Sequence, residues 1–126
     1  SLAKCDNKLL TSILPETKVS KIASDTMVGG ATLTKLLGTS AWYAPGASVS
    51  FLVNAILNDT RETLPCSVLL SGEYQTHDIC IGVPVIIGKN GVEEIVELDL
   101  NAADKAKFQN SVNAVKETNS SLNGLI

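Results

Sequence analysis

Few side chains in this sequence could do acid–base or nucleophilic chemistry, because it holds one histidine, His77, and one arginine, Arg61. His77 precedes Asp78, and a histidine beside a carboxylate can begin a general base. Neighbouring side chains point apart in an extended segment, however, and no serine or cysteine nucleophile is organised around this pair. We therefore expect His77 to be an exposed loop residue, and we assign no catalytic residue to this chain.

The carboxylates offer no better catalyst. Glu93, Glu94 and Glu97 could imitate an acid–base pair, but the first two face opposite ways on a strand, which predicts an exposed acidic edge. Arg61 and Glu62 lie in a short polar connection, where surface pairing is expected to contribute little. A self-contained catalyst for an anionic substrate usually needs several arginines, and this sequence has one.

The three cysteines form neither a CxxC pair nor a regular framework. Cys66 and Cys80 lie in apolar stretches, where a free cysteine behaves as a small hydrophobe. We expect reduced structural thiols, Cys5 included. A zinc site would need a fourth ligand, so we expect no metal. No secretory signal opens the sequence, and these features together favour a soluble cytoplasmic protein.

One segment does invite a functional interpretation. Residues 38–48 place small and hydroxyl-bearing residues beside the one tryptophan, Trp42, at the start of a predicted helix. Backbone N–H groups and the helix dipole favour an anion there, such as a carboxylate. The alternative is a capped helix whose small residues permit tight packing, and the residues alone leave both interpretations open.

The elements that would position this segment belong to one domain over residues 1–126. A chain of 126 residues with 44% apolar residues can bury one core. Its net charge of −3 argues against nucleic-acid binding, and no apolar run is long enough to span a membrane.

The hydrophobic pattern predicts segregated α+β structure, with helices packed on a small, mostly antiparallel sheet. Residues 1–14 read as a connector. A half-buried helix follows from Glu16, with Gly29-Gly30 marking a bend or a close crossing. A second helix then runs to about Asn58, with an inward stripe of Val49, Leu52, Val53, Ile56 and Leu57. Three strands are predicted over 66–70, 79–87 and 92–98. The last helix is capped by Asn101, and its apolar face comprises Phe108, Val112, Val115 and Leu122. A β-hairpin over 79–98 turns at Asn90-Gly91 in type I′ geometry, and no nucleotide-binding sheet is predicted.

Several motifs together resemble the C-terminal, substrate-binding domain of the lactate/malate dehydrogenase family. Residues 39–48 (TSAWYAPGAS) are similar to the Ser-Ala-aromatic-Tyr-Ala-Pro segment of its lactate-dehydrogenase-like malate dehydrogenases. Residues 64–66, 72–74, 78–85 and 88–95 and the last helix also fit the family, in the same order. The resemblance covers nearly the whole chain from Leu9.

This resemblance implies a parent enzyme that interconverts malate and oxaloacetate by hydride transfer with NAD, in carboxylic acid metabolism. It implies that a Rossmann domain outside this chain binds NAD, and that the catalytic histidine and the substrate-binding arginines also lie outside it. Here, Thr39, Ser40 and Ala41 would line the substrate pocket and Pro45 would lie near the nicotinamide.

The chain begins with Ser1, so we expect a piece of a longer protein that is inactive alone and whose parent forms a homodimer or homotetramer. A non-enzymatic oligomerisation or binding module is the alternative. A second alternative is the same domain of an L-lactate dehydrogenase, which Ala41 and Pro45 disfavour, because lactate enzymes tend to carry threonine and an aliphatic residue there.

Overall fold

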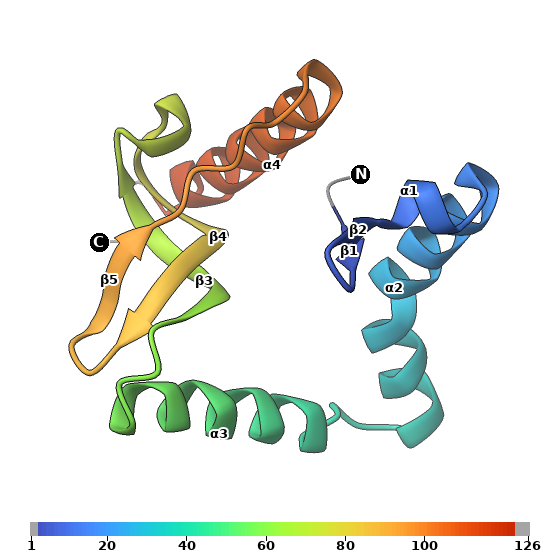
Figure 1. Ribbon diagram of the computed structural model, residues 1–126, viewed down its shortest axis with the longest axis horizontal. Helices are drawn as coiled ribbons and strands as arrows, with labels where there is room; N and C mark the ends of the chain where they lie inside the picture. Colours follow the sequence, from blue (N-terminus) through green and yellow to red (C-terminus); the bar gives the residue numbers. More distant parts are fainter. Residues whose placement is uncertain (1–2, 123–126) are drawn as a thin grey trace. The chain divides into compact units, whose positions relative to one another are not determined.

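The computed structural model describes residues 3–122 (Figure 1). The chain divides into two compact units that meet between Ala47 and Ser48, and each has its own internal packing. Among the described residues, none of the helices combines the length and apolarity that a membrane crossing requires.

The first unit opens with a small hairpin in place of the connector expected over residues 1–14. β1 (Lys4–Cys5) pairs with antiparallel β2 (Lys8–Leu9). The two-residue turn has positive φ at Asp6 (47°) and Asn7 (62°), the signs that a type I′ turn requires. One helical turn, α1 (Leu10–Ile13), follows directly. Residues 1 and 2 of the predicted connector lie outside the described part.

The long helix predicted from Glu16 is present as α2 (Glu16–Leu37), with Pro15 as its N-cap residue. The expected half-buried face was wrong for this chain, since α2 has no buried residue and Met27 is 86% exposed. The structure shows no close crossing at Gly29 and Gly30 within the described residues: α2 runs through both, and a Cβ at either would meet nothing within 4 Å. The apolar period predicted the helix correctly, but the first unit offers no surface that would bury it.

The second helix, α3 (Tyr43–Leu57), contributes its C-terminal half to the core of the second unit. Ala55 is buried, and Leu52 and Ile56 pack against the core beside it. Three members of the predicted inward stripe are instead exposed: Val49, Val53 and Leu57. The stripe predicted from periodicity was too wide, because of these six residues only Leu52, Ala55 and Ile56 pack into the core.

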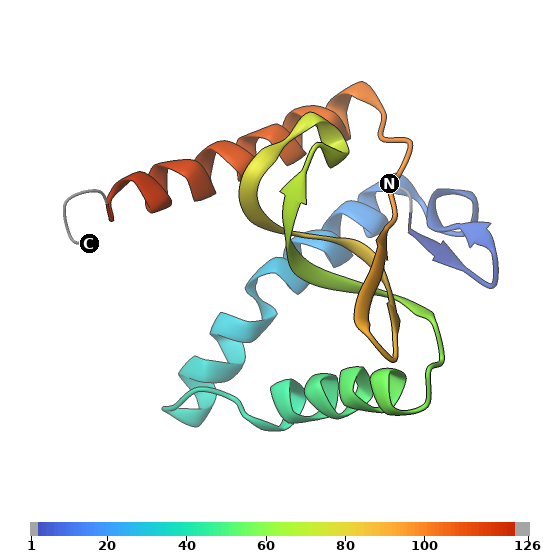
Figure 2. The same ribbon diagram turned by 90° about the vertical axis from the view of Figure 1, so that its left-hand side faces the viewer.

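The second unit is built on an antiparallel sheet in the order β3-β4-β5 (Figures 1 and 2). Its strands are β3 (Glu62–Ser71), β4 (His77–Gly88) and β5 (Gly91–Ile95). Alternate side chains of β4 are buried, namely Ile79, Ile81, Val83, Val85 and Ile87. The three predicted strands and the α+β class are therefore confirmed, although β3 begins earlier than expected and β5 ends earlier.

The β4–β5 hairpin has the predicted position but a different turn. Gly88 pairs with Gly91, so Lys89 and Asn90 form the two-residue loop. A type I′ turn needs positive φ at both loop residues. Only the following Gly91 has positive φ, at 87°, so the predicted type I′ geometry was wrong. The register then shifts between Ile86 and Ile87, which places a bulge in β5.

The last helix, α4 (Ala102–Ser120), begins as predicted. The Asn101 carboxamide oxygen accepts the Asp104 N–H at 2.9 Å, which satisfies one of the donors left free at a helix start. Val112 is buried against the sheet, and Phe108 and Val115 flank it. Leu122 follows the helix end and is exposed, so it does not belong to the predicted apolar face.

Candidate functional site

The segment 38–48 joins α2 to α3 with little regular structure of its own. Gly38 ends α2 in the left-handed conformation (φ 70°), and its N–H donates to the Thr34 carbonyl at 3.0 Å. Glycine adopts this conformation without the steric cost of a Cβ, which explains the abrupt stop. Thr39 to Trp42 then run without helix or strand until α3 begins at Tyr43.

The predicted pocket residues lie together in this connection. Thr39 and Ser40 are exposed, and Ala41 is half-buried. Neither hydroxyl makes a hydrogen bond within residues 3–122, so neither caps α3 there. Pro45, assigned beside the nicotinamide, is exposed in the first turn of α3. The structure thus leaves two hydroxyl groups and a small apolar side chain available to a group outside the described chain.

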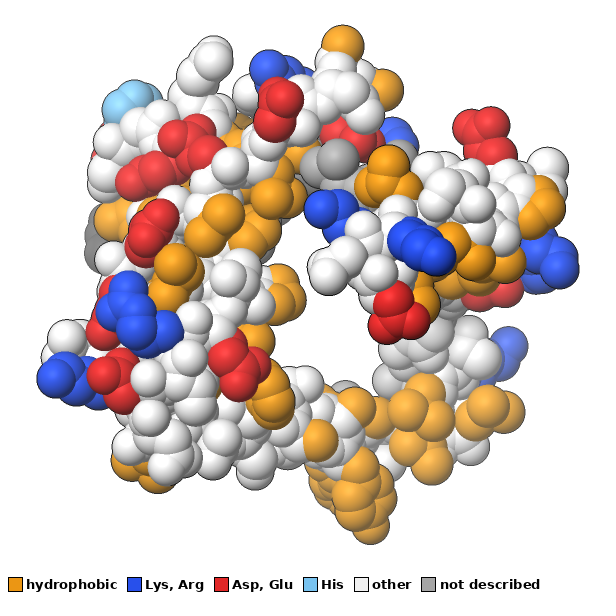
Figure 3. Space-filling model, in the orientation of Figure 1, with side chains coloured by type: hydrophobic (Ala, Val, Ile, Leu, Met, Phe, Trp, Pro, Cys, Tyr) orange, Lys and Arg blue, Asp and Glu red, His pale blue; other side chains and the backbone are white. Residues whose placement is uncertain are grey.

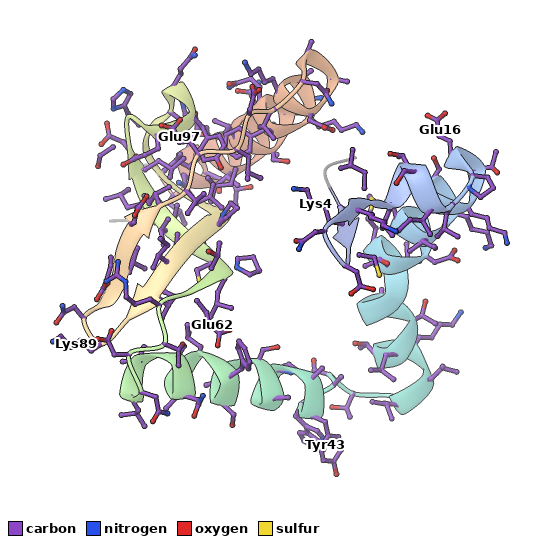
Figure 4. All side chains as sticks on the ribbon, viewed as in Figure 1. Lys4, Glu16, Tyr43, Glu62, Lys89 and Glu97 are labelled. Atoms are coloured by element: carbon purple, nitrogen blue, oxygen red, sulfur yellow. The ribbon has the colours of Figure 1, made fainter. Side chains whose placement is uncertain are left out.

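Two aromatic residues follow this hydroxyl pair and do not serve a core. Trp42 is 67% exposed and Tyr43 is 88% exposed. Figure 4 shows the Tyr43 side chain projecting away from the ribbon. Pro45 has no N–H to donate. The hydrogen bond at the start of α3 runs from the Gly46 N–H to the Trp42 carbonyl, at 2.8 Å. Such exposed aromatic side chains are typical of a surface that another protein segment covers.

The acid–base candidates weighed from the sequence lie on different strands, His77 on β4 and Glu93 and Glu94 on β5. His77 is exposed, as expected, but it is the first residue of β4 rather than a loop residue. Within the described residues, no group of three or more histidine, cysteine, aspartate or glutamate side chains could hold a metal ion. The three cysteines are free, and Cys66 packs against the core, whereas Cys80 is exposed on β4 and does not fill the role of a buried hydrophobe.

Arg61 has a different partner from the one expected. It binds the Glu93 carboxylate of β5 rather than pairing with Glu62, which begins β3. The nearby Asp59 Oδ1 accepts the Lys89 N–H at 2.9 Å. The expected exposed acidic edge is therefore partly engaged: Glu93 is half-buried in an ion pair, while Glu94 remains exposed. Figure 3 shows acidic and basic side chains side by side over this part of the second unit.

Tyr74 is the residue that sequence reasoning missed most clearly. It lies in a single 3₁₀ turn, η1 (Glu73–Gln75), with positive φ (52°). Its hydroxyl donates to the Val96 carbonyl at 2.7 Å and accepts the Leu98 N–H at 3.0 Å. Its ring packs against the Phe108 ring, with centroids 5.0 Å apart and the two planes tilted by 33°. The sequence signal for a sharp turn at this point was Gly72, and in the structure Gly72 has a φ of 140°.

Glu73, beside Tyr74, has a lowered pKa. The main cause is the Ser71 N–H, which donates to the Glu73 carboxylate at 2.7 Å and stabilises its charged form. The Glu73 N–H and the nearby His77 lower this pKa further. The shift stabilises the turn between β3 and β4 and does not create a proton donor.

A pocket of about 450 Å³ lies next to Tyr74 in the second unit. Its lining combines two aromatic rings with acidic, basic and amide side chains: Tyr74, Gln75, Glu97, Asp99, Lys105, Phe108 and Gln109, together with Leu98, Leu100 and Ala106. One of its carboxylates is already engaged, because Glu97 accepts the Tyr74 N–H at 2.7 Å. None of the site residues predicted from the sequence lines this pocket.

Comparison with known proteins agrees with the resemblance found from the motifs. A family model for the lactate/malate dehydrogenase α/β C-terminal domain matches residues 7–122. Malate dehydrogenase of Bacteroides thetaiotaomicron is 63% identical over 113 residues, which are 90% of this chain and 36% of that protein. This chain therefore spans little more than a third of that relative's length.

Two solved structures share the fold. Malate dehydrogenase from Salinibacter ruber has a TM-score of 0.92 and 37% identity, over 97% of this chain and 40% of that one. Lactate dehydrogenase from Eimeria maxima, solved with NADH and oxamate, has a TM-score of 0.85 and 34% identity, over 91% of this chain and 36% of that one. The chain belongs to the lactate/malate dehydrogenase family, by virtue of its α/β C-terminal domain.

Proposed function

We propose that this chain is the substrate-side part of a malate dehydrogenase, which interconverts malate and oxaloacetate by hydride transfer with NAD. The 63% identity to a malate dehydrogenase, over 90% of the chain, carries this proposal. The described residues include few acid–base groups. This agrees with the proposal, because a separate part of the enzyme would supply the base and the arginines.

Within this proposal, residues 39–45 form one wall of the substrate pocket. The Ser40 hydroxyl, which has no partner among residues 3–122, donates a hydrogen bond to the bound acid. Ala41 leaves space that a larger side chain would fill. A hydroxyl buried by substrate discriminates strongly, because a substrate without a matching group leaves it unpaired.

The described residues do not fit NAD on their own. A dinucleotide site needs a glycine-rich turn between a strand of a parallel sheet and a helix. The strands described here are all antiparallel, and the sequence has no GxGxxG spacing. We therefore place the cofactor on another part of the whole enzyme, with Pro45 contributing to the wall beside the nicotinamide.

The whole enzyme is proposed to be a homodimer or homotetramer. Support comes from α2 and the first half of α3, whose apolar side chains are largely exposed in this chain. Burial of such side chains against other protein segments would stabilise the helices, since a helix gains most of its stability from packing.

A chimera tests the proposal directly. This chain replaces the matching C-terminal part of the Bacteroides thetaiotaomicron enzyme, and oxaloacetate-dependent NADH oxidation is measured. We expect activity from the chimera, and none from the 126-residue chain alone or from the relative truncated at the junction. A chimera that folds and assembles but is inactive would refute the proposal, as would turnover by the pure chain.

Two substitutions in the chimera test the wall. Ser40→Ala should raise the KM for oxaloacetate, whereas Ser50→Ala, at an exposed serine within α3, should leave it unchanged. Ala41→Thr should lower the ratio of oxaloacetate to pyruvate activity. The structural similarity to a lactate dehydrogenase makes lactate the second candidate substrate, and a chimera that prefers pyruvate would favour it.

A further inference from the structure

Asn90 and Gly91 form an asparagine–glycine sequence at the tip of the β4–β5 hairpin. Lys89 and Asn90 make up its two-residue loop, and the loop is exposed. Figure 4 labels Lys89 at this tip. Within residues 3–122, no hydrogen bond holds the Asn90 carboxamide.

We propose that Asn90 is a site of spontaneous covalent modification, at which the asparagine converts to aspartate and isoaspartate. The Gly91 backbone nitrogen attacks the Asn90 side-chain carbonyl carbon, a C–N bond forms, and ammonia leaves with the proton lost by that nitrogen. Water then opens the five-membered imide at either carbonyl, which produces aspartate or isoaspartate. Only water is consumed, and no oxidant or enzyme is required.

The residue after the asparagine decides how readily the ring closes. Glycine has no side chain to crowd the attacking nitrogen and has a wide choice of backbone angles. Around Gly91 the space is open, since a Cβ built there would meet nothing within 4 Å. Asparagine is among the thermally labile residues of proteins.

The other described asparagines are poorer sites. None of them precedes glycine. Several are also held by hydrogen bonds: the Asn58 amide donates to the Asn54 carbonyl at 3.0 Å, and Asn101 caps α4. Asn113 lies within α4 and accepts the Gln109 amide at 3.1 Å. Asn123 also precedes glycine but lies outside the described residues.

Conversion would loosen the hairpin. An isoaspartate adds a methylene to the backbone of a two-residue loop, so Gly88 and Gly91 can no longer pair as they do now. The new carboxylate also adds a negative charge to a region that already holds Asp59 and Glu93. Both effects act on the contacts between the hairpin and the chain that follows α3.

Incubation of folded and urea-unfolded samples of the chain at mildly alkaline pH tests this inference. Samples are taken when half of the molecules in the unfolded sample have lost the amide at residue 90. The tryptic peptides that end at Lys105, which contain residue 90, are then compared by mass spectrometry. Enzymatic methylation of isoaspartate is the second readout. We expect loss of the amide in the folded sample as well, with the peptides that hold Asn58 and Asn113 unchanged. Asn90→Gln should abolish the change in peptides ending at Lys105. An intact amide at residue 90 in the folded sample, or equal conversion at Asn58, would overturn the proposal.

Discussion

The Tyr74 hydroxyl replaces a hydrogen bond that Pro84 cannot make. The Val96 N–H donates to the Pro84 carbonyl at 2.9 Å, which is one half of a paired antiparallel position. The other half would be an N–H at residue 84 donating to the Val96 carbonyl, and proline has none. The Tyr74 hydroxyl donates to that carbonyl at 2.7 Å instead.

Replacing Tyr74 with phenylalanine should therefore destabilise the second unit. The ring and its packing against Phe108 remain, but the Val96 carbonyl and the Leu98 N–H both lose their partner. A hydrogen bond contributes about 0.5–1.5 kcal/mol net, and an unsatisfied buried group costs about 1–3 kcal/mol. Val96 is half-buried, whereas Leu98 is 42% exposed and its N–H can bind water. We expect a loss of about 1–2 kcal/mol in the free energy of unfolding.

Urea unfolding followed by far-UV circular dichroism measures this loss, and amide exchange at Leu98 locates it. Tyr43→Phe is the matched control, because Tyr43 is 88% exposed and makes no hydrogen bond within the described residues. The substitution Pro84→Ala restores an N–H opposite Val96, so Tyr74→Phe should cost less in that background. Equal costs in both backgrounds, or an equal effect of Tyr43→Phe, would refute the reasoning.

Three further predictions concern the same unit. Gln75→Gly should raise the free energy of unfolding by about 0.5–1 kcal/mol, because Gln75 has φ 55° and glycine adopts this conformation without strain; a lower midpoint in urea would contradict this. Asn101→Ala should cost about 0.5–2 kcal/mol in the same assay, through loss of the α4 cap, whereas Asn119→Ala near the helix end should cost less. The lowered pKa of Glu73 gives stability that is present above the unfolded pKa and is lost as the pH falls through the folded pKa. Glu73→Gln should therefore reduce the acid dependence of the unfolding midpoint, and an unchanged dependence would argue against the Ser71 contact.

The sequence correctly predicted the elements that depend on interactions between neighbouring residues. The alternating apolar residues of 79–87 identified β4, and Asn101 with Asp104 identified the start of α4. The position of the β4–β5 hairpin followed from its Asn-Gly pair. These patterns depend on side-chain period, capping and glycine conformation, which act over a few neighbouring residues.

Contacts between residues far apart in the chain could not be predicted from the sequence. The pairing of Arg61 with Glu93, 32 positions away, depends on the hairpin folding back to the end of α3. The buried face of α3 likewise depended on which residues the rest of the second unit covers: Ala55, Leu52 and Ile56 pack into the core, whereas Val49, Val53 and Leu57 are exposed. The type I′ turn assigned to Asn90-Gly91 failed because the strand register makes Lys89 and Asn90 the loop and leaves the only positive φ of this turn at Gly91.

By itself, the sequence determined the α+β class, the order of the strands along the chain and the family, because the motifs that carry them are contiguous. The family resemblance of its motifs also led to Thr39, Ser40, Ala41 and Pro45 as the pocket residues that we propose. The tertiary structure decided that the Thr39 and Ser40 hydroxyls have no partner among the described residues. Only the tertiary structure showed that the Tyr74 hydroxyl donates the hydrogen bond that Pro84 cannot donate to the Val96 carbonyl. The reason is that the strand register, which places Val96 opposite Pro84, does not follow from the sequence.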